Sequence, residues 1–522
     1  MKLHSSVTRA CMLLLALSLL ATLNSCTSGT SGGGAPPVPR DINKFISSLE
    51  NDHFTVQEGQ VIYLDALKMA SEGLLKSCFG NNQGSPYLTY ILPPAPGQNP
   101  AAGQNPPVHY NPNDPNNYPA NPDFYPPGLL YKLRNDEAIV FIGKITPKCV
   151  YFGYRSYVFY VENKPGKEYP PNSVIGNSTT GLYHPIFGSL GDQLNNLNIY
   201  SDGTPSGKPG VPFDSVTAII VSADRGINQR VRSALVQSGY PSYMVNDDVI
   251  PSGFVKMGLE KGKDAFSYLM RISQFENAAA GKNFLDTLGS TSRVFRVTPQ
   301  DSTALQPYPV PVLKPRGSGK SEFEILSNVT EDMEYLRSRI LQTYAAPGYN
   351  YTELNTVIGI PEGFVAYAND VNAQGDNRDT TYLKADDFQF NSDDDFLIIY
   401  GLNHDMSGKS IYNNAVFYGK ALLNGVATVF SQLFLHSAVS YFPQGYSNAD
   451  KYYVYKMARN ASPGENCVVI PKSTGNPDGS AYGVDNNQDV FVAFRAYIEL
   501  ATGIGTSYYE IQYDRAIIFH KI

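Results

Sequence analysis

Two stretches of the chain align residue for residue, at a constant offset and without a gap. The first, DEAIVFIGKITPKCVYFGYRSYVFY, runs from Asp136 to Tyr160, and the second, DDFLIIYGLNHDMSGKSIYNNAVFY, runs from Asp394 to Tyr418. Apolar positions before a shared Gly match in kind, and the closing Val-Phe-Tyr matches in identity. Self-similarity of this sort indicates a repeated structural unit. The alternative is that Tyr- and Gly-rich strand-and-loop segments resemble each other by composition alone.

A second pair of segments, DAFSYLMRISQFENAAAG and DVFVAFRAYIELATGIG, matches more loosely. The matched residues are Asp264, Phe266, Arg271 and Glu276 in the first segment and Asp489, Phe491, Arg495 and Glu499 in the second. This second alignment needs a gap, and its offset is smaller than that of the first alignment. Neither pair of segments is therefore evidence for the other.

Strand-like and helix-like patterns are mixed along the chain without a regular βαβ rhythm, which favours an α+β (mixed α/β) fold. We expect it to consist of two duplicated sheet-plus-helix halves. Strands are expected at 136–143, 151–160, 216–222, 292–299 and 394–401. Helices are expected within 41–80, 226–236, 264–275, 321–345, 414–435 and 451–459.

The N-terminus has the order of features found in export signals. Lys2 and Arg9 accompany an apolar run, Ala10 to Leu23, that is too short to span a bilayer comfortably. The following Asn-Ser-Cys resembles the end of a bacterial lipobox, whose Cys, here Cys26, is lipidated. We therefore expect an exported protein, lipid-anchored to a bacterial membrane at the cell surface or the periplasmic face, with the lipid bilayer as a partner. The alternative is a plain secretory signal cleaved nearby.

The expected domain organisation follows from these features and from shifts in composition. A Ser/Gly/Pro-rich tether follows Cys26, and a Pro-, Asn- and Tyr-rich stretch lies between Pro93 and Pro127. The expected segments are a lipoprotein signal peptide (1–25), a tether (26–40), an N-terminal helical segment with the Pro/Asn/Tyr-rich loop (41–130), a first half (131–312), a helical connector (313–385) and a second half (386–522).

The net charge argues against one class of function, and the cysteine content limits the number of disulfides. A net charge of −7 argues against a nucleic-acid-binding surface, which needs clustered Lys and Arg. Once Cys11 leaves with the signal and Cys26 carries lipid, Cys78, Cys149 and Cys467 remain. They allow at most one disulfide, and the pairing stays open.

The two aligned copies differ in the loop after their shared Gly. The first reads KITPKCVYFG, whereas the second reads LNHDMSGKSI and gathers Asn403, His404, Asp405 and Lys409. A His can exchange a proton near neutral pH, a carboxylate can orient it, and a Lys can neutralise an anion. This loop is our first candidate site; the alternative is a strand-ending turn.

Three further residues are candidates. Asp224 follows a predicted strand, where ligands often bind in open sheets, although it could equally cap the next helix. Arg495 and Glu499 lie in FRAYIELATGIG among apolar residues and could form a buried structural pair.

Oxygen-bearing side chains also suggest a weak calcium site. Asp370, Asn372 and Asp376 fall at positions 1, 3 and 7 of an EF-hand-like loop, but its twelfth position is Thr381 where an EF-hand has Glu. No other cofactor is indicated.

Several segments together resemble a family of exported bacterial proteins known only as uncharacterised. They read SLGDQLNNLNI, SADRGINQRVRSAL, VNDDVIP, GDNRDTTYL, YGLNHDMSGKSIYNN and FRAYIELATGIG. The resemblance covers most of the chain after about residue 130. It implies export and transfers no activity, fold or catalytic residue to particular positions.

Our functional hypothesis is binding, or hydrolytic processing, of a small polar or polymeric ligand in a cleft near the junction of the two halves. The alternative is a non-catalytic cell-surface interaction or adhesion protein that uses the Tyr/Pro-rich loop, since exposed Tyr makes contacts at low entropy cost. Whether the protein is an enzyme stays open at this stage.

Overall fold

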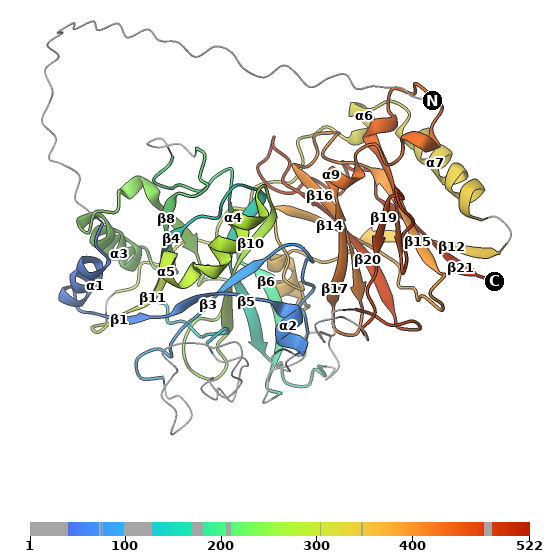
Figure 1. Cartoon of the computed structure of the whole chain (residues 1–522). Coiled ribbons are helices and arrows are strands. Elements are labelled where there is room, and N and C mark those ends of the chain that lie inside the picture. Colours follow the sequence, from blue (N-terminus) through green and yellow to red (C-terminus); the bar gives the residue numbers. More distant parts are fainter. Residues whose placement is uncertain are drawn as a thin grey trace, which may run out of the picture. The chain divides into compact units, whose positions relative to one another are not determined.

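The structure is a computed structural model that describes residues 40–71, 75, 77–98, 128–169, 181–204, 210–302, 304–345, 348–473 and 483–522 (Figure 1). All of them belong to one compact unit, Pro39–Ile522. None of the helices in this described part of the chain combines the length and apolar character needed to cross a membrane. The predicted signal peptide, Cys26 and most of the tether lie outside the described residues, as do positions 99–127 of the Pro/Asn/Tyr-rich loop.

The first half contains two sheets. Its strands are β1 (Phe54–Glu58), β2 (Gln60–Tyr63), β3 (Tyr87–Ile91), β4 (Ala138–Lys144), β5 (Cys149–Glu162), β6 (Tyr183–Ser189), β7 (Leu194–Asn195), β8 (Val216–Ser222), β9 (Val245–Val249), β10 (Ala265–Phe275) and β11 (Ser292–Pro299). Its helices are α1 (Ile42–Asn51), α2 (Ala66–Ser71), α3 (Arg225–Gln237), α4 (Ala278–Asp286) and α5 (Leu288–Thr291). The outer sheet has the order β1-β11-β4-β8-β9, and the inner sheet has the order β2-β3-β10-β5-β6 with β7 paired to β5.

The second half also contains two sheets. Its strands are β12 (Tyr349–Leu354), β13 (Thr356–Ile358), β14 (Thr380–Ala385), β15 (Phe396–Leu402), β16 (Tyr412–Gly419), β17 (Asn424–Phe430), β18 (Tyr452–Ala458), β19 (Cys467–Val469), β20 (Val490–Tyr497) and β21 (Arg515–Lys521). Its helices are α6 (Glu322–Ile325), α7 (Val329–Tyr344), α8 (Gly363–Asn369) and α9 (Ser431–Phe434). The outer sheet has the order β12-β21-β15-β18-β19, and the inner sheet has the order β13-β14-β20-β16-β17.

The two halves share one topology. When the two-residue β7 is left out, the ten described strands of the first half can be matched one by one, in chain order, with the ten described strands of the second half. Matched strands then occupy the same positions in the outer sheets and in the inner sheets of the two halves. In both outer sheets the last two strands pair in parallel, β8 with β9 and β18 with β19. The gapless sequence alignment pairs β4 with β15 and β5 with β16, which are the same pairs that this matching gives. The prediction of two related halves in an α+β fold is therefore confirmed.

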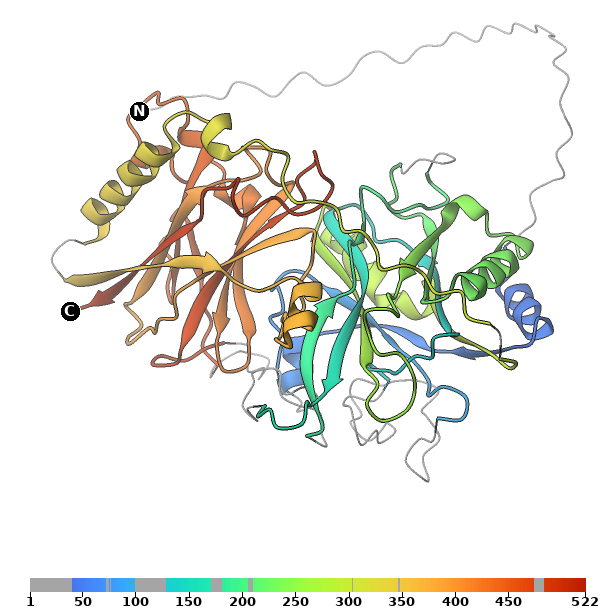
Figure 2. The same cartoon turned by 180° about the vertical axis from the view of Figure 1, so that it is seen from behind.

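The layers of each half are held by their own apolar cores. One face of the first outer sheet is covered by α1 and α3 (Figures 1 and 2), through residues such as Phe45 and Val231, and its other face packs on the inner sheet. In the second half, α7 covers the outer sheet through Leu336 and Ile340. A further core joins the two inner sheets, with Phe159 and Phe491 as members from the two halves. The halves therefore meet through their inner sheets.

Several strands were predicted as helices. Segment 264–275 forms β10, segment 414–435 forms β16 and β17 and ends in the short α9, and segment 451–459 contains β18. The residues of β10 are buried through its first nine positions, so neither face carries the polar residues that reveal a period of two. Segment 41–80, expected to be helical, contains β1 and β2 besides α1 and α2, and the expected helical connector contains β12, β13 and β14 besides α6, α7 and α8.

Candidate functional site

His404 is fully enclosed by two acidic side chains. Its Nδ1 lies 2.8 Å from Oε1 of Glu322, and its Nε2 lies 3.4 Å from Oδ2 of Asp514. All three side chains are buried. Glu322 also accepts hydrogen bonds from the Ser407 hydroxyl and the backbone N–H of Gln512, so His404 ties the first turn of α6 to the loop that follows β15.

The protonation state of His404 follows from this geometry. Burial lowers its pKa, but the two carboxylates Glu322 and Asp514 outweigh burial and raise the pKa to about 10. At neutral pH the imidazole is therefore a cation with both nitrogens occupied. A general base must be able to accept a proton, so the predicted catalytic role of His404 does not fit this arrangement.

Lys409 forms the centre of a second buried cluster. Its Nζ lies 2.7 Å from Glu499, 2.5 Å from Glu510 and 3.1 Å from the Ser318 hydroxyl. Both carboxylates thus neutralise this cation, which leaves it no free charge for a ligand. Glu499 does not pair with Arg495 as predicted, because the chain turns at Ile498, where φ is +48°, and separates the two side chains.

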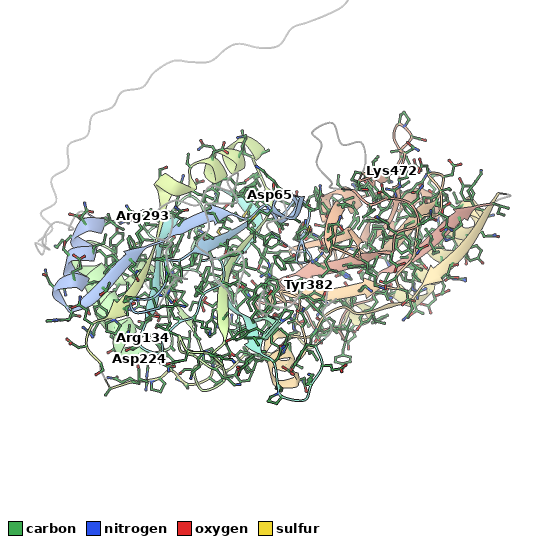
Figure 3. All side chains as sticks on the ribbon, turned by 90° about the horizontal axis from the view of Figure 1, so that it is seen from below. Asp65, Arg134, Asp224, Arg293, Tyr382 and Lys472 are labelled. Carbon is green, nitrogen blue, oxygen red and sulfur yellow. The ribbon has the colours of Figure 1, made fainter. Side chains whose placement is uncertain are left out.

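The other residues of the first candidate loop have ordinary structural roles. Asn403 donates from its side-chain amide to the carbonyl of Ser431, and Asp405 is exposed. Asp224 caps α3, since its carboxylate accepts the backbone N–H of Ile227, as one of the two sequence interpretations expected (Figure 3).

The oxygens of the predicted calcium loop are already used by protein donors. Asp370 accepts from Lys167, Tyr169 and His184, and Asn372 accepts the backbone N–H of Gln374. Within the described residues, no group of three or more His, Cys, Asp or Glu side chains could hold a metal ion. The structure therefore offers no support for the calcium prediction.

Asp376, the third residue of that loop, is buried and faces the first half. Its carboxylate accepts the backbone N–H and hydroxyl of Ser189 and the backbone N–H of Gly363. It therefore connects the segment before β14 to the end of β6.

A cavity of about 330 Å³ lies between the two inner sheets. Its lining includes Ser267, Leu269 and Arg271 from β10, Tyr382 and Lys384 from β14, Tyr418 from β16, and Phe491, Ala493, Arg495 and Tyr497 from β20. Exposed Gln374 and Lys420 also contribute to the lining and place part of it at the surface. A volume of this size suits a small molecule, and the position agrees with the predicted cleft near the junction of the halves.

The charged residues of this cavity all have the same sign. Arg271, Arg495, Lys384 and Lys420 line it, and no Asp or Glu is among its described lining residues. Lys384 and Lys420 lie near its surface and share Asp387 as a partner, at 2.6 and 2.7 Å, and Lys420 also lies 3.8 Å from Asp489. The two arginines are 6% and 8% exposed, and neither forms an ion pair with a carboxylate of the described residues.

Arg271 is held by neutral groups. It donates to the Tyr157 hydroxyl and, over 2.6 Å, to the backbone carbonyl of Gly375. Gly375 has φ of +73°, and a Cβ there would lie 2.6 Å from the Phe187 ring, so only Gly fits. Burial raises the pKa of Tyr157 to about 12, so this phenol is neutral and does not cancel the charge of Arg271.

Arg495 has the same kind of surroundings. It donates over 2.5 Å to the Tyr418 hydroxyl, and burial raises the pKa of that phenol to about 12. Its guanidinium lies 5.4 Å from the ring centroid of Tyr418 and 5.5 Å from that of Tyr382. Its Nη1 is buried and has no hydrogen-bond partner. An unpaired, buried charged group is costly, so this atom is suited to receive a ligand.

The two arginines occupy related places in the duplicated fold. Arg271 on β10 lies directly opposite Tyr87 on β3, and Arg495 on β20 lies directly opposite Tyr382 on β14. These strand pairs correspond to each other in the two halves. Each half thus contributes one arginine, stacked on a cross-strand tyrosine, to the same cavity.

Only Arg495 among the sequence-predicted site residues lines this cavity. Arg271 was missed as a site residue although it had been matched to Arg495 in the looser alignment. That repeated arginine was the signal that could have revealed the pair. Cys78, one of three free thiols in the described residues, also lines the cavity, and burial raises its pKa to about 12.

Comparisons with known proteins add no functional information. No family model matches the chain, and no curated protein is significantly similar to it. Among solved structures, an uncharacterised protein from Burkholderia cenocepacia is similar at a TM-score of 0.32 and 9% identity, over 92% of this chain and 88% of that chain. A protein from Vibrio parahaemolyticus is similar at a TM-score of 0.30 and 9% identity, over 74% of this chain and 87% of that chain. We base no argument on similarities at these scores.

Proposed function

We propose that the protein binds a small organic anion in the cavity between its two inner sheets. The observation that carries this proposal is the presence of two buried arginines, Arg271 and Arg495, without a carboxylate partner among the described residues of the cavity. Two such charges in a low-dielectric interior are costly unless an anion compensates them. Arginine also matches the oxygens of carboxylates and phosphates through paired N–H donors.

Binding without catalysis fits the groups at this cavity better than hydrolysis does. The described residues that line it supply guanidinium and ammonium groups, phenols, amides, two hydroxyls and the Cys78 thiol, but no carboxylate or imidazole that could serve as a general base. Burial raises the pKa of Tyr418 to about 12, so this phenol is a poor base at neutral pH. We therefore propose a binding protein rather than a hydrolase.

Isothermal titration calorimetry with octanoate tests this function. The unaltered chain should bind it, and the double variant R271Q/R495Q should bind at least 100-fold more weakly, since it has lost both guanidinium groups. R293Q is a matched control, because Arg293 (Figure 3) is half-buried, pairs with Glu58 and is not among the residues that line the cavity. If the double variant and R293Q bind octanoate equally, the cavity is not the site.

We also propose that the protein is exported and lipid-anchored through Cys26. The support is the sequence order of charge, apolar run and Cys within the first 26 residues. Labelling cells with a palmitate analogue should mark the unaltered protein but not C26A, which should also leave the membrane fraction. Labelling of C26A would exclude this anchor. The adhesion alternative stays a prediction, because most of its loop lies outside the described residues.

A further inference from the structure

Two of the four cations that line the cavity form no ion pair with a described carboxylate. Lys384 and Lys420 share Asp387 as a partner, and Lys420 also lies 3.8 Å from Asp489. These two cations are therefore already neutralised near the cavity surface. Arg271 and Arg495 contact only neutral phenols and a backbone carbonyl through their described hydrogen bonds.

Both guanidinium groups act at one place in the cavity. Tyr382 is stacked against Arg495 across the β14–β20 pair. Arg271 and Arg495 both line the same cavity of about 330 Å³. The unpartnered Nη1 of Arg495 supplies a free donor there. A single anionic group can therefore interact with both arginines.

The strands that carry the arginines also carry apolar cavity residues. Residues two apart on a strand lie on the same face, about 6–7 Å from each other. Leu269 precedes Arg271 in this way, and Ala493 and Phe491 precede Arg495. Further apolar lining residues include Leu64, Leu129, Leu130, Phe159, Phe187 and Leu423. The cavity thus combines a doubly positive region with an apolar wall.

We propose that the ligand is an amphiphile whose head is a phosphate monoester dianion bound by Arg271 and Arg495 together, and whose hydrocarbon body lies against the apolar wall. This inference rests on the proposed function and specifies its ligand. A phosphate monoester carries a charge between −1.5 and −2 at neutral pH, with a second pKa near 6 and three acceptor oxygens. A monocarboxylate would neutralise only one of the two guanidinium groups.

The test compares octyl phosphate, octanoate and inorganic phosphate on the purified chain by calorimetry. Octyl phosphate should bind at least tenfold more tightly than octanoate at pH 7.5, because its head matches both charges. Its affinity should fall severalfold between pH 7.5 and pH 5.5 as the head takes up its second proton, while that of octanoate should change less than twofold. Each methylene added to the alkyl phosphate should strengthen binding about fourfold, and inorganic phosphate should bind weakly.

Single variants distinguish a phosphate head group that is bound by both arginines from one that is bound by a single arginine. R271Q and R495Q should each lose the preference for octyl phosphate over octanoate but keep measurable octanoate binding, since one guanidinium remains. Thermal unfolding checks that each variant is folded. If octanoate binds as tightly as octyl phosphate, or the phosphate shows no pH dependence, the dianion inference is overturned and the proposed function stands. If no amphiphilic anion binds, both are overturned.

Discussion

Arg495 lies directly opposite Tyr382 across strands β20 and β14, with its guanidinium 5.5 Å from the centroid of the phenol ring. Tyr87 and Arg271 repeat this cross-strand relationship in the other half. A cation over an aromatic face gains some stabilisation, but less than a buried ion pair needs to offset its desolvation. The two arginines are therefore better explained by a ligand than by the stability of the unliganded fold.

This explanation predicts that removing an arginine from the cavity costs little stability. R495M should unfold in urea within about 1 kcal/mol of the unaltered protein, or be more stable, because a buried charge without a partner is lost. Arg296 provides the contrast, since it is buried beside the buried carboxylate of Glu137 at 3.4 Å. R296M should cost about 3–5 kcal/mol because it strands that carboxylate. Similar losses in both variants would mean that Arg495 has a structural role.

The His404 cluster should contribute stability and not binding. H404Q removes a buried cation from between Glu322 and Asp514 and should lower the free energy of unfolding at pH 7 by about 3–5 kcal/mol. Octanoate affinity of the folded variant should stay unchanged. His53, which is exposed beside Asp301, offers the control H53Q, expected to change stability by less than about 0.5 kcal/mol.

The same cluster has a defined pH dependence. The pKa of His404 is about 10 in the folded state and near 6.5 in the unfolded chain. Its contribution should therefore be complete below about pH 6.5 and should be lost as the pH rises through 10. In urea titrations between pH 6 and pH 10, the stability difference between the unaltered protein and H404Q should shrink with rising pH; a constant difference would contradict the assignment.

Asp379 should produce a slope of the same sign, a loss of stability with rising pH, but in a lower pH range. Its carboxylate is fully buried, accepts hydrogen bonds from Tyr151 and Asn195, and has one oxygen without a partner. Burial raises its pKa to about 7. The folded state thus holds a proton more tightly than the unfolded state between about pH 4 and pH 7, so stability should fall by up to about 4 kcal/mol across that window and be constant above it.

D379N mimics the protonated acid and should remove this dependence. Its stability relative to the unaltered protein should rise between pH 4.5 and pH 7.5, as measured by urea unfolding at several pH values. Parallel pH profiles of the two proteins would show that Asp379 does not titrate in this range.

The thiols of Cys78 and Cys149 should be inert in the folded protein. Cys78 and Cys149 are buried and free, and burial raises the pKa of each to about 12. A thiol-reactive reagent at pH 8 should modify Cys78 and Cys149 only after denaturant is added, because almost none of either thiol is ionised in the folded protein. Rapid modification of Cys78 or Cys149 in the native protein, located by peptide mapping, would contradict this burial.

The sequence predicted the fold better than it predicted the site. The repeat was visible because β4 and β15 have the same length and share a glycine at the same strand position, and because β5 and β16 share their closing Val-Phe-Tyr. Strand β10 was mistaken for a helix because both of its faces are buried, which removes the alternation that marks a strand. Propensity and periodicity report local exposure, and they fail where tertiary packing covers both faces.

The candidate site was missed for a different physical reason. We had expected chemistry where the two copies differ, which pointed to His404, yet His404 and Ser407 of that loop both bind Glu322 and hold α6 in place. The cavity instead uses what the copies share, an arginine opposite a tyrosine on equivalent strands. Whether a charged residue has a partner depends on residues distant in sequence, such as Glu322 and His404, and no local pattern contains that information.

In each half the first strand pairs antiparallel with the last, so that Phe54 lies opposite Pro299 and Tyr349 lies opposite Lys521. The entry and the exit of each half are consequently neighbours at one sheet edge. A gene for one half would encode a closed unit, and two copies of that unit meeting through their inner sheets would form a homodimer with one arginine from each subunit in a shared chamber. In the single chain the two arginines need not have identical surroundings, and their described hydrogen bonds differ: Arg271 donates to a phenol and a backbone carbonyl, and Arg495 donates to a phenol alone.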